Sequence, residues 1–333
     1  MKITALGVNS AFAIGDYKNA VSIDEIKNTV KEFKNNGKIT LNQLLAKLED
    51  KAQKLYYPKW QSNFLIEFER TGQENPYRLI MDFGGDIRHS LAEVGLNIND
   101  IDAFYCSHPH ADHIGGVEFI ALSTLFNPFY RSGKVEWMKD DEGNFRNLPK
   151  RLAEGEEIPA EYRPTLYAHK SVLNELWHAA QPGLETIQGV PDVNLETFFD
   201  VHEMYDNKPL VMEDGKRHWK MFTVTSVHIN AGYRQMPSFG LWIEGSDGQI
   251  IFMPTDTQFM TPKQVSLYYD RASVIYQDCE TGPRSDVHPH IEDLQTLEPE
   301  TKKKCLLYHY NIPPEGVDDE FGEILVRGRT HEY

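Results

Sequence analysis

Short apolar stretches separated by polar turns predict β-strands in both halves of the chain. Residues 3–8 form the first stretch, and residues 63–68 with 77–83 predict an antiparallel hairpin across the polar turn between them. Strands are also predicted at residues 101–107, 219–229, 239–245, 249–256, 273–279 and 304–310. Sheets therefore begin and end the fold.

Helical spacing of apolar residues appears between these stretches. Ile23, Ile26 and Val30 begin a pattern that predicts two helices, and we interpret residues 16–60 as a helical insertion. After Gly84 and Gly85, Asp86 is placed to cap a helix that begins at Ile87. Residues 131–200 are less regular, acidic and rich in proline, and they suggest a second insertion or a lid. Strands followed by helices predict a layered α/β fold, with residues 1–333 forming one domain.

Composition narrows the class of protein. The 333 residues are 40 % hydrophobic and 25 % charged, as in ordinary globular proteins. The net charge of −16 opposes binding of a polyanion, so we expect long nucleic acid not to be the main ligand. Cys106, Cys279 and Cys305 are odd in number and far apart, which favours a reducing compartment without disulfides.

The apolar runs of the chain are too short to cross a membrane. None reaches the roughly 18 residues that a membrane-spanning helix needs. The first apolar run, which follows Lys2, is interrupted at Asn9 and Ser10, which favours a strand over a signal peptide. We therefore expect a cytoplasmic protein with no membrane partner.

The most informative segment is SHPHADHIGG, residues 107–116. It places His108, His110, Asp112 and His113 directly after a predicted strand. In an extended segment His108 and His110 project to the same side, so both rings can reach one metal ion. The turn that follows would aim Asp112 and His113 at a second position, which predicts a two-metal centre with ions about 3.5 to 4 Å apart.

Two ions need more ligands than this segment supplies. His228, Asp256 and His309 each end a later predicted strand, where polar side chains can gather at one edge of a sheet. A carboxylate can bridge two cations whereas an imidazole ordinarily binds one, so Asp256 is the expected bridge. Nitrogen and oxygen ligands without a thiolate suit two Zn²⁺ ions, with Mn²⁺ or iron as alternatives.

At this point the sequence resembles the metallo-β-lactamase fold superfamily of metal-dependent hydrolases, whose motif HxHxDHxGG is met in residues 108–116. The resemblance implies an αββα sandwich carrying two insertions, and a homodimer. It implies that a first ion is bound by His108, His110 and His228, and a second by Asp112, His113 and His309. Asp256 would bridge the two ions.

Within the superfamily the closest pattern is the branch of RNase Z and the cyclic nucleotide phosphodiesterases. Residues 228–244 resemble its "H…P-S-Y-G-Y-R-I" segment, and residues 254–259 resemble its "G-D-T" turn. Glutamine occupies position 277, where the tRNA enzymes would have histidine. The sequence also shows no Gly/Pro-rich arm of the kind that binds tRNA. The expected function is hydrolysis of a small phosphodiester, such as a cyclic nucleotide, by a metal-bound hydroxide. An RNase Z-like RNA endonuclease, a thioester or lactone hydrolase, and a sensor without turnover are the alternatives.

Two residues are candidates for catalysis. Asp112 is placed to orient the attacking hydroxide and accept its proton, as well as to bind metal. Protonation of the leaving alkoxide needs another group, for which His288 is preferred over His290. Asp82 is expected to fix a ligand or a loop by hydrogen bonds. Gly84 and Gly85 fit a plain turn better than a phosphate-binding one.

Overall fold

The computed structural model describes residues 1–10, 27–28, 30–31, 59–127, 137–139, 145–149, 157–187 and 190–333. The chain divides into two compact units, residues 1–11 with 60–333, and residues 12–59. The helical insertion predicted at residues 16–60 lies almost entirely outside the described residues. Within it, the described residues 27–28 and 30–31 are helical. Both large sheets belong to the first unit.

The first sheet has seven strands in the order β16-β1-β2-β3-β4-β7-β8. Their bounds are β1 Lys2–Gly7, β2 Asn63–Phe68, β3 Tyr77–Met81, β4 Ala103–Cys106, β7 Thr165–Ala168, β8 Asp200–Glu203 and β16 Thr330–Glu332. The predicted hairpin is confirmed, because β2 and β3 pair antiparallel with Phe64 opposite Met81. From β3 to β8 the neighbouring strands are parallel, so their carboxyl ends share one edge.

The second sheet also has seven strands, in the order β15-β14-β13-β12-β11-β10-β9. Their bounds are β9 Leu210–Asp214, β10 Arg217–Thr225, β11 Phe239–Gly245, β12 Ile250–Met253, β13 Val274–Asp278, β14 Cys305–Tyr308 and β15 Glu323–Ile324. Strands β12 to β15 are parallel, and β10 runs in the same direction because β11 is antiparallel to both of its neighbours. A small third sheet pairs β5 (Trp137–Lys139) with β6 (Phe145–Pro149).

Strands that are buried on both faces explain the continuous apolar runs in the sequence. In β2, Phe64 and Ile66 belong to the core between the two sheets, whereas Leu65 packs with helices on the outer face. In β12, Met253 faces the same inter-sheet core and Phe252 faces the opposite helical layer. Each sheet therefore has one face against the other sheet and one face under helices.

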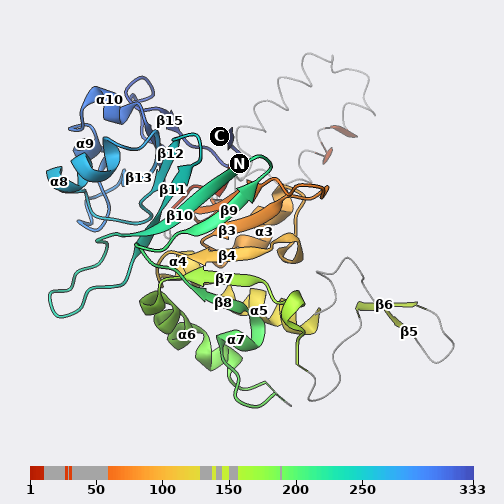
Figure 1. Cartoon of the computed structure of the whole chain (residues 1–333). Coiled ribbons are helices and arrows are strands. Elements are labelled where there is room, and N and C mark those ends of the chain that lie inside the picture. The colour runs from red at the N-terminus through yellow and green to blue at the C-terminus, as the bar shows by residue number, and fades with distance from the viewer. Residues whose placement is uncertain are drawn as a thin grey trace. The chain divides into compact units, whose positions relative to one another are not determined.

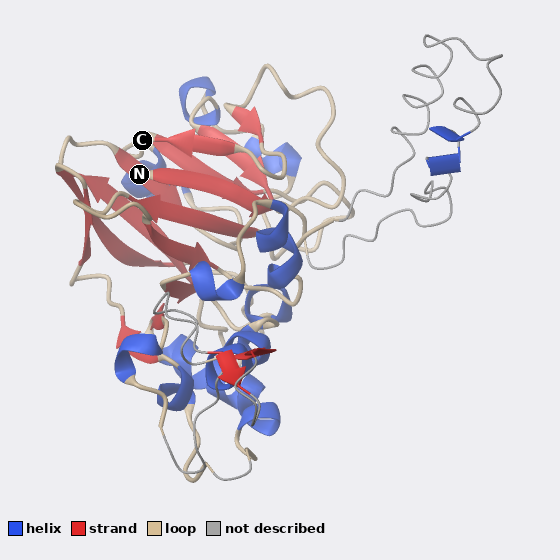
Figure 2. Cartoon of the chain, turned by 90° about the vertical axis from the view of Figure 1, so that its right-hand side faces the viewer, coloured by secondary structure: helices blue, strands red, loops and turns tan. Residues whose placement is uncertain are grey.

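The helices form the two outer layers (Figures 1 and 2). The first sheet is covered by α3 (Ile87–Glu93), α5 (Val117–Phe126), α6 (Lys170–Leu184) and α7 (Leu195–Phe198). On the second sheet lie α8 (Pro262–Gln264), the π-helix η3 (Val265–Tyr269), α9 (Ile291–Leu294) and α10 (Pro299–Lys302). The remaining short helices are η1 (Ile98–Asp100), α4 (Ala111–Ile114) and η2 (Ala160–Tyr162). The predicted αββα sandwich is confirmed, and no described helix is long and apolar enough to span a bilayer.

Some local predictions differ from the structure. Strand β7 lies within residues 131–200 and β8 begins at residue 200; both join the first sheet, although the sequence did not predict strands there. Asp86 does occupy the N-cap position of α3, but its carboxylate accepts the Gln61 backbone N–H at 2.7 Å instead of capping the helix. Residues 128–136, 140–144 and 150–156 lie outside the described residues, and a lid function of residues 131–200 stays a prediction.

Candidate metal centre

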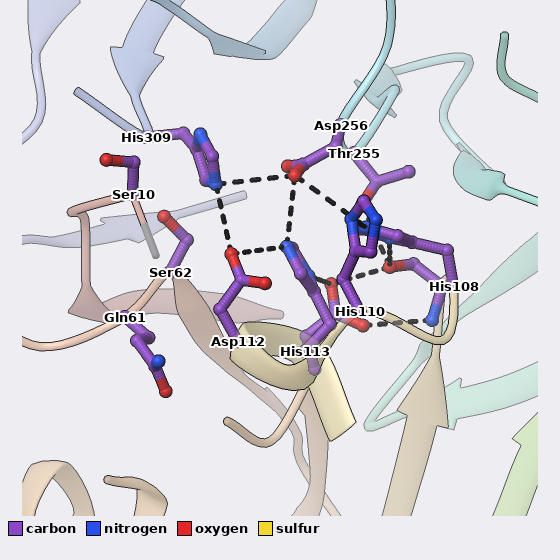
Figure 3. Close-up of polar contacts among 12 residues, drawn as sticks. Ser10, Gln61, Ser62, His108, His110, Asp112, His113, Thr255, Asp256 and His309 are labelled. Atoms are coloured by element: carbon purple, nitrogen blue, oxygen red, sulfur yellow. Dashed lines mark hydrogen bonds and ion pairs between the residues drawn. The ribbon is translucent and has the colours of Figure 1, made fainter. Parts of the chain in front are cut away.

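The carboxyl ends of the parallel strands bring the predicted site residues together. His108 and His110 follow β4, and Asp112 and His113 lie in the short helix α4. His228 follows β10, Asp256 follows β12 and His309 follows β14. Figure 3 shows Asp256 between His309, Asp112 and His113 on one side and His108 and His110 on the other. The expectation that polar residues at the ends of strands gather at one edge of a sheet, which we call the strand-end rule, thus identified side chains that meet in space.

These seven side chains form two groups that share Asp256. His108, His110 and His228 with Asp256 make one group, and Asp112, His113 and His309 with Asp256 make the other. Within each group the ligand-type atoms lie within 4.8 Å of one another. Six of the seven residues are buried, and His110 is half-buried. The grouping is the one that the superfamily resemblance implies.

Three ring nitrogens converge in the first group. The Nε2 atoms of His108 and His228 each lie 3.1 Å from Nδ1 of His110. Nδ1 of His228 donates to the backbone oxygen of Val287 at 2.8 Å, so Nε2 of that neutral ring carries a lone pair. Burial lowers the pKa of His108 well below its usual value and that of His228 to about 4, so both rings are neutral.

The second group is charged. Nε2 of His113 lies 3.2 Å from Oδ2 of Asp256 and 3.4 Å from Oδ2 of Asp112. Burial opposes charge on His113, but the carboxylates of Asp256, Asp112 and Asp82 raise its pKa well above the usual value. Burial would likewise raise the pKa of Asp256, yet His309 and His113 hold it well below its ordinary range. Two carboxylates therefore stay ionised in a buried place beside the cationic ring of His113, and a divalent cation could take over that charge compensation by displacing the His113 proton.

The donor set fits divalent cations. Among the described residues, Oδ1 of Asp256 and Nε2 of His309 are buried without a hydrogen-bond partner. Such atoms are costly unless something coordinates them. Converging imidazole lone pairs and ionised carboxylates are the ligands that Zn²⁺ and similar ions accept. Both groups could hold a metal ion.

A hydrogen-bond network around Asp82 holds the metal-binding segment and its candidate ligand His113 in place. Asp82 accepts the backbone N–H of Ser107 at 2.9 Å and its hydroxyl at 2.8 Å. The same carboxylate lies 2.8 Å from Nδ1 of His113. Asp82 thus fixes both a loop and a candidate ligand, as predicted, and directs Nε2 of His113 toward the shared carboxylate.

His288 lies over the two groups. Its ring is 4.8 Å from the His228 ring and 4.7 Å from the His309 ring, between centroids. Nδ1 of His288 pairs at 3.1 Å with Oδ2 of Asp278, a buried carboxylate at the end of β13. Burial lowers the pKa of His288, but the hydrogen bond to Asp278 and the charge of Asp256 together raise it to about 9. Burial raises the pKa of Asp278 to about 6, so at neutral pH the pair is an imidazolium and a carboxylate.

His290 has a different place. Its Nδ1 accepts the backbone N–H of Glu292 at the start of α9, and its Nε2 lies 3.2 Å from the backbone oxygen of Gly282. Both ring nitrogens are therefore engaged in holding the loop. The geometry favours His288 over His290 as the group that faces a substrate.

Three residues of this region escaped the sequence analysis: Ser107, Thr255 and Asp278. Asp278 ends a predicted strand, so the strand-end rule that found Asp256 could have found it. Ser107 and Thr255 gave no signal of their own, because short hydroxyl side chains are common beside strands. Their hydrogen bond to each other is known only from the fold.

Comparisons with known proteins give the family. A sequence model described as "Anti-Pycsar protein Apyc1" matches residues 51–138 and 152–331. A protein of that name from Paenibacillus harenae is 25 % identical over 233 residues, which are 70 % of this chain and 78 % of that protein. Another, from Bacillus phage 010DV004, is 22 % identical over 280 residues, which are 82 % of this chain and 91 % of the phage protein.

Solved structures give the fold. The metallo-β-lactamase fold protein YhfI from Bacillus subtilis superposes with a TM-score of 0.55 at 13 % identity, covering 99 % of this chain and 98 % of that one. A diphosphatase from the PhnP family gives a TM-score of 0.58 at 14 % identity, over 100 % of this chain and 97 % of that one. The chain has the metallo-β-lactamase fold and belongs to the Anti-Pycsar protein Apyc1 family.

Proposed function

We propose that this chain is a dinuclear metal-dependent phosphodiesterase acting on a small, cyclic nucleotide. The observation that carries the proposal is the pair of ligand groups that share Asp256. Two divalent cations bound there would lower the pKa of a shared water and polarise a phosphoryl oxygen. His108, His110 and His228 would hold one ion, and Asp112, His113 and His309 the other.

The chain's own residues supply the proton transfers. Asp112 orients the attacking water and accepts its proton, because its carboxylate belongs to the second group and stays ionised. Burial would raise the pKa of Asp112, but the charge of His113 and the ring nitrogens of His113 and His309, 3.4 and 3.5 Å from its Oδ2, hold that pKa well below the usual value. His288, with Nδ1 engaged by Asp278, has Nε2 left to protonate the departing alkoxide.

Metal content and a substrate panel test the proposal. Protein purified without chelator should hold about two Zn²⁺ or Mn²⁺ ions per chain and hydrolyse 3′,5′-cyclic nucleotides. The same panel should contain precursor tRNA, a thioester and a lactone, which represent the competing activities. Metal content near zero that added metal does not restore would contradict the centre, whereas turnover only of another panel member would replace the substrate class.

The assembly and location of the protein belong to the same proposal. Homodimer formation rests on the resemblance to the superfamily, and light scattering of the purified chain tests it. The three cysteines are buried free thiols, which suits a reducing compartment such as the cytoplasm. Fractionation of cells that express the full-length protein tests the location.

A further inference from the structure

Thr255 has a backbone conformation that its residue type avoids. Its φ is +60°, in the left-handed region, where a β-branched side chain crowds the backbone. The other described non-glycine residues with positive φ are aspartates and a histidine, types that tolerate it better: Asp82, Asp192, Asp286 and His309. Glycine would occupy position 255 without strain. A threonine at this position therefore indicates that its side chain has a role that glycine could not supply.

The Thr255 hydroxyl has one described partner, and that partner lies behind the metal centre. Oγ1 of Thr255 donates to Oγ of Ser107 at 2.9 Å, and both residues are fully buried. The bond joins positions 148 residues apart: Ser107 follows β4 of the first sheet, and Thr255 follows β12 of the second. Because Thr255 directly precedes Asp256 and Ser107 directly precedes His108, the bond links the two loops that carry these candidate ligands.

The hydrogen bonds of Ser107 determine the tautomer of His108. The single hydroxyl hydrogen of Ser107 goes to Oδ2 of Asp82 at 2.8 Å, because an ionised carboxylate can only accept. Nδ1 of His108 lies 3.0 Å from the same hydroxyl oxygen and must therefore donate to it. Nε2 of His108 is then unprotonated and faces His110. The hydroxyl of Thr255 donates to the remaining lone pair of the Ser107 oxygen, so the Ser107 hydroxyl uses its full hydrogen-bonding capacity.

We propose that Thr255 is a positioning residue whose strained backbone is retained because its hydroxyl, through Ser107, fixes the position of His108 relative to Asp256. The inference rests on the proposed metal centre. It separates two effects of one residue: the backbone of Thr255 costs stability, and its hydroxyl improves metal binding. Substitutions that change one effect without the other can distinguish them.

Three variants at position 255 test the inference by zinc affinity, measured in competition with a chromophoric chelator, and by the Tm of the metal-free protein. Thr255→Gly removes both strain and hydroxyl, so zinc affinity should fall about 10- to 100-fold, while the relieved strain should keep the metal-free Tm at or above that of Thr255→Val. Thr255→Val keeps the strain and loses the hydroxyl, so zinc affinity should fall similarly without a gain in Tm. Thr255→Ser keeps the hydroxyl and should bind zinc within about threefold of the unaltered protein.

Asp192→Gly is the matched control, because Asp192 also has positive φ but is exposed and outside the metal groups. It should leave zinc affinity unchanged. Zinc affinity of Thr255→Gly within about threefold of the unaltered protein, or a metal-free Tm below that of Thr255→Val, would overturn the inference. Failure of the unaltered protein to bind zinc would contradict the proposed function itself, so the two failures are distinguishable.

Discussion

Asp256 is the residue on which both candidate metal positions depend. Its Oδ2 lies between 3.2 and 3.8 Å from ring nitrogens of His108, His113 and His228, and 3.3 Å from that of His309. Replacing Asp256 by alanine would remove the shared carboxylate and would leave the two proposed cations with less negative charge between them. We expect activity to fall by about 100-fold or more and the metal content to drop, while circular dichroism shows a folded protein. Near-normal turnover of Asp256→Ala would mean that the centre is built differently.

The role of His288 can be separated from folding by the choice of leaving group. An alkoxide needs a proton to depart and a nitrophenolate does not. His288→Ala should therefore lower kcat by about 100-fold or more on a cyclic nucleotide and by less than about tenfold on a nitrophenyl phosphodiester. His290→Ala serves as the control, since His290 holds the neighbouring loop and α9. Equal losses on both substrates in His288→Ala would remove it from the acid role.

At the scale of elements, the turn between β3 and α3 is packed tightly against the metal-binding segment. A Cβ added at Gly84 would lie 2.3 Å from the backbone oxygen of Asp112 and 2.3 Å from Oε1 of Gln61. A Cβ at Gly85 would meet nothing within 4 Å. Gly84 is therefore needed for the close approach of two backbone segments, in keeping with the plain turn that the sequence favoured.

This packing predicts different outcomes for neighbouring glycines. Gly84→Ala should destabilise the protein by about 1–3 kcal/mol and lower activity, because the start of α4 with Asp112 and His113 must shift. Gly85→Ala should change the free energy of unfolding by less than about 1 kcal/mol. Denaturant unfolding of the two variants, together with kcat on one substrate, measures the difference. Equal stability of both variants would show that the Asp112 backbone can move away from a Cβ at position 84 without lowering the free energy of unfolding.

At the scale of the whole molecule, net charge bears on the substrate. RNA-binding proteins gain most of their affinity from lysine and arginine facing phosphates, and this chain has 34 basic against 50 acidic side chains. A substrate with a single negative charge suffers much less from that field. We expect measurable hydrolysis of 3′,5′-cyclic nucleotides and weak or no cleavage of precursor tRNA in the same buffer. Efficient tRNA cleavage beside inert cyclic nucleotides would favour the RNA endonuclease instead.

Local sequence determined the strands of the two sheets and most of the candidate metal ligands. Apolar runs bounded by turns are a property of neighbouring residues, and so is the dense His and Asp segment at residues 107–116. Polar residues at strand ends could then be assigned to one edge, because parallel strands place their carboxyl ends together. The short strands β7, β8, β9, β15 and β16 escaped detection, because their pairing with the sheets, rather than their own pattern, makes them strands.

Apart from Asp82, only the tertiary structure decided which polar groups support the site. Asp278 meets His288 across ten positions, and Thr255 meets Ser107 across 148. Neither pair has a local pattern: the Thr255–Ser107 bond depends on how the two sheets stack, and the Asp278–His288 pair depends on the path of the loop after β13. The sequence already favours His288 over His290, and the structure adds their different partners: Nδ1 of His288 pairs with Asp278, whereas Nε2 of His290 lies near the backbone oxygen of Gly282. Sequence periodicity reports which face a residue occupies, whereas the partner on that face is set by the packing of distant segments.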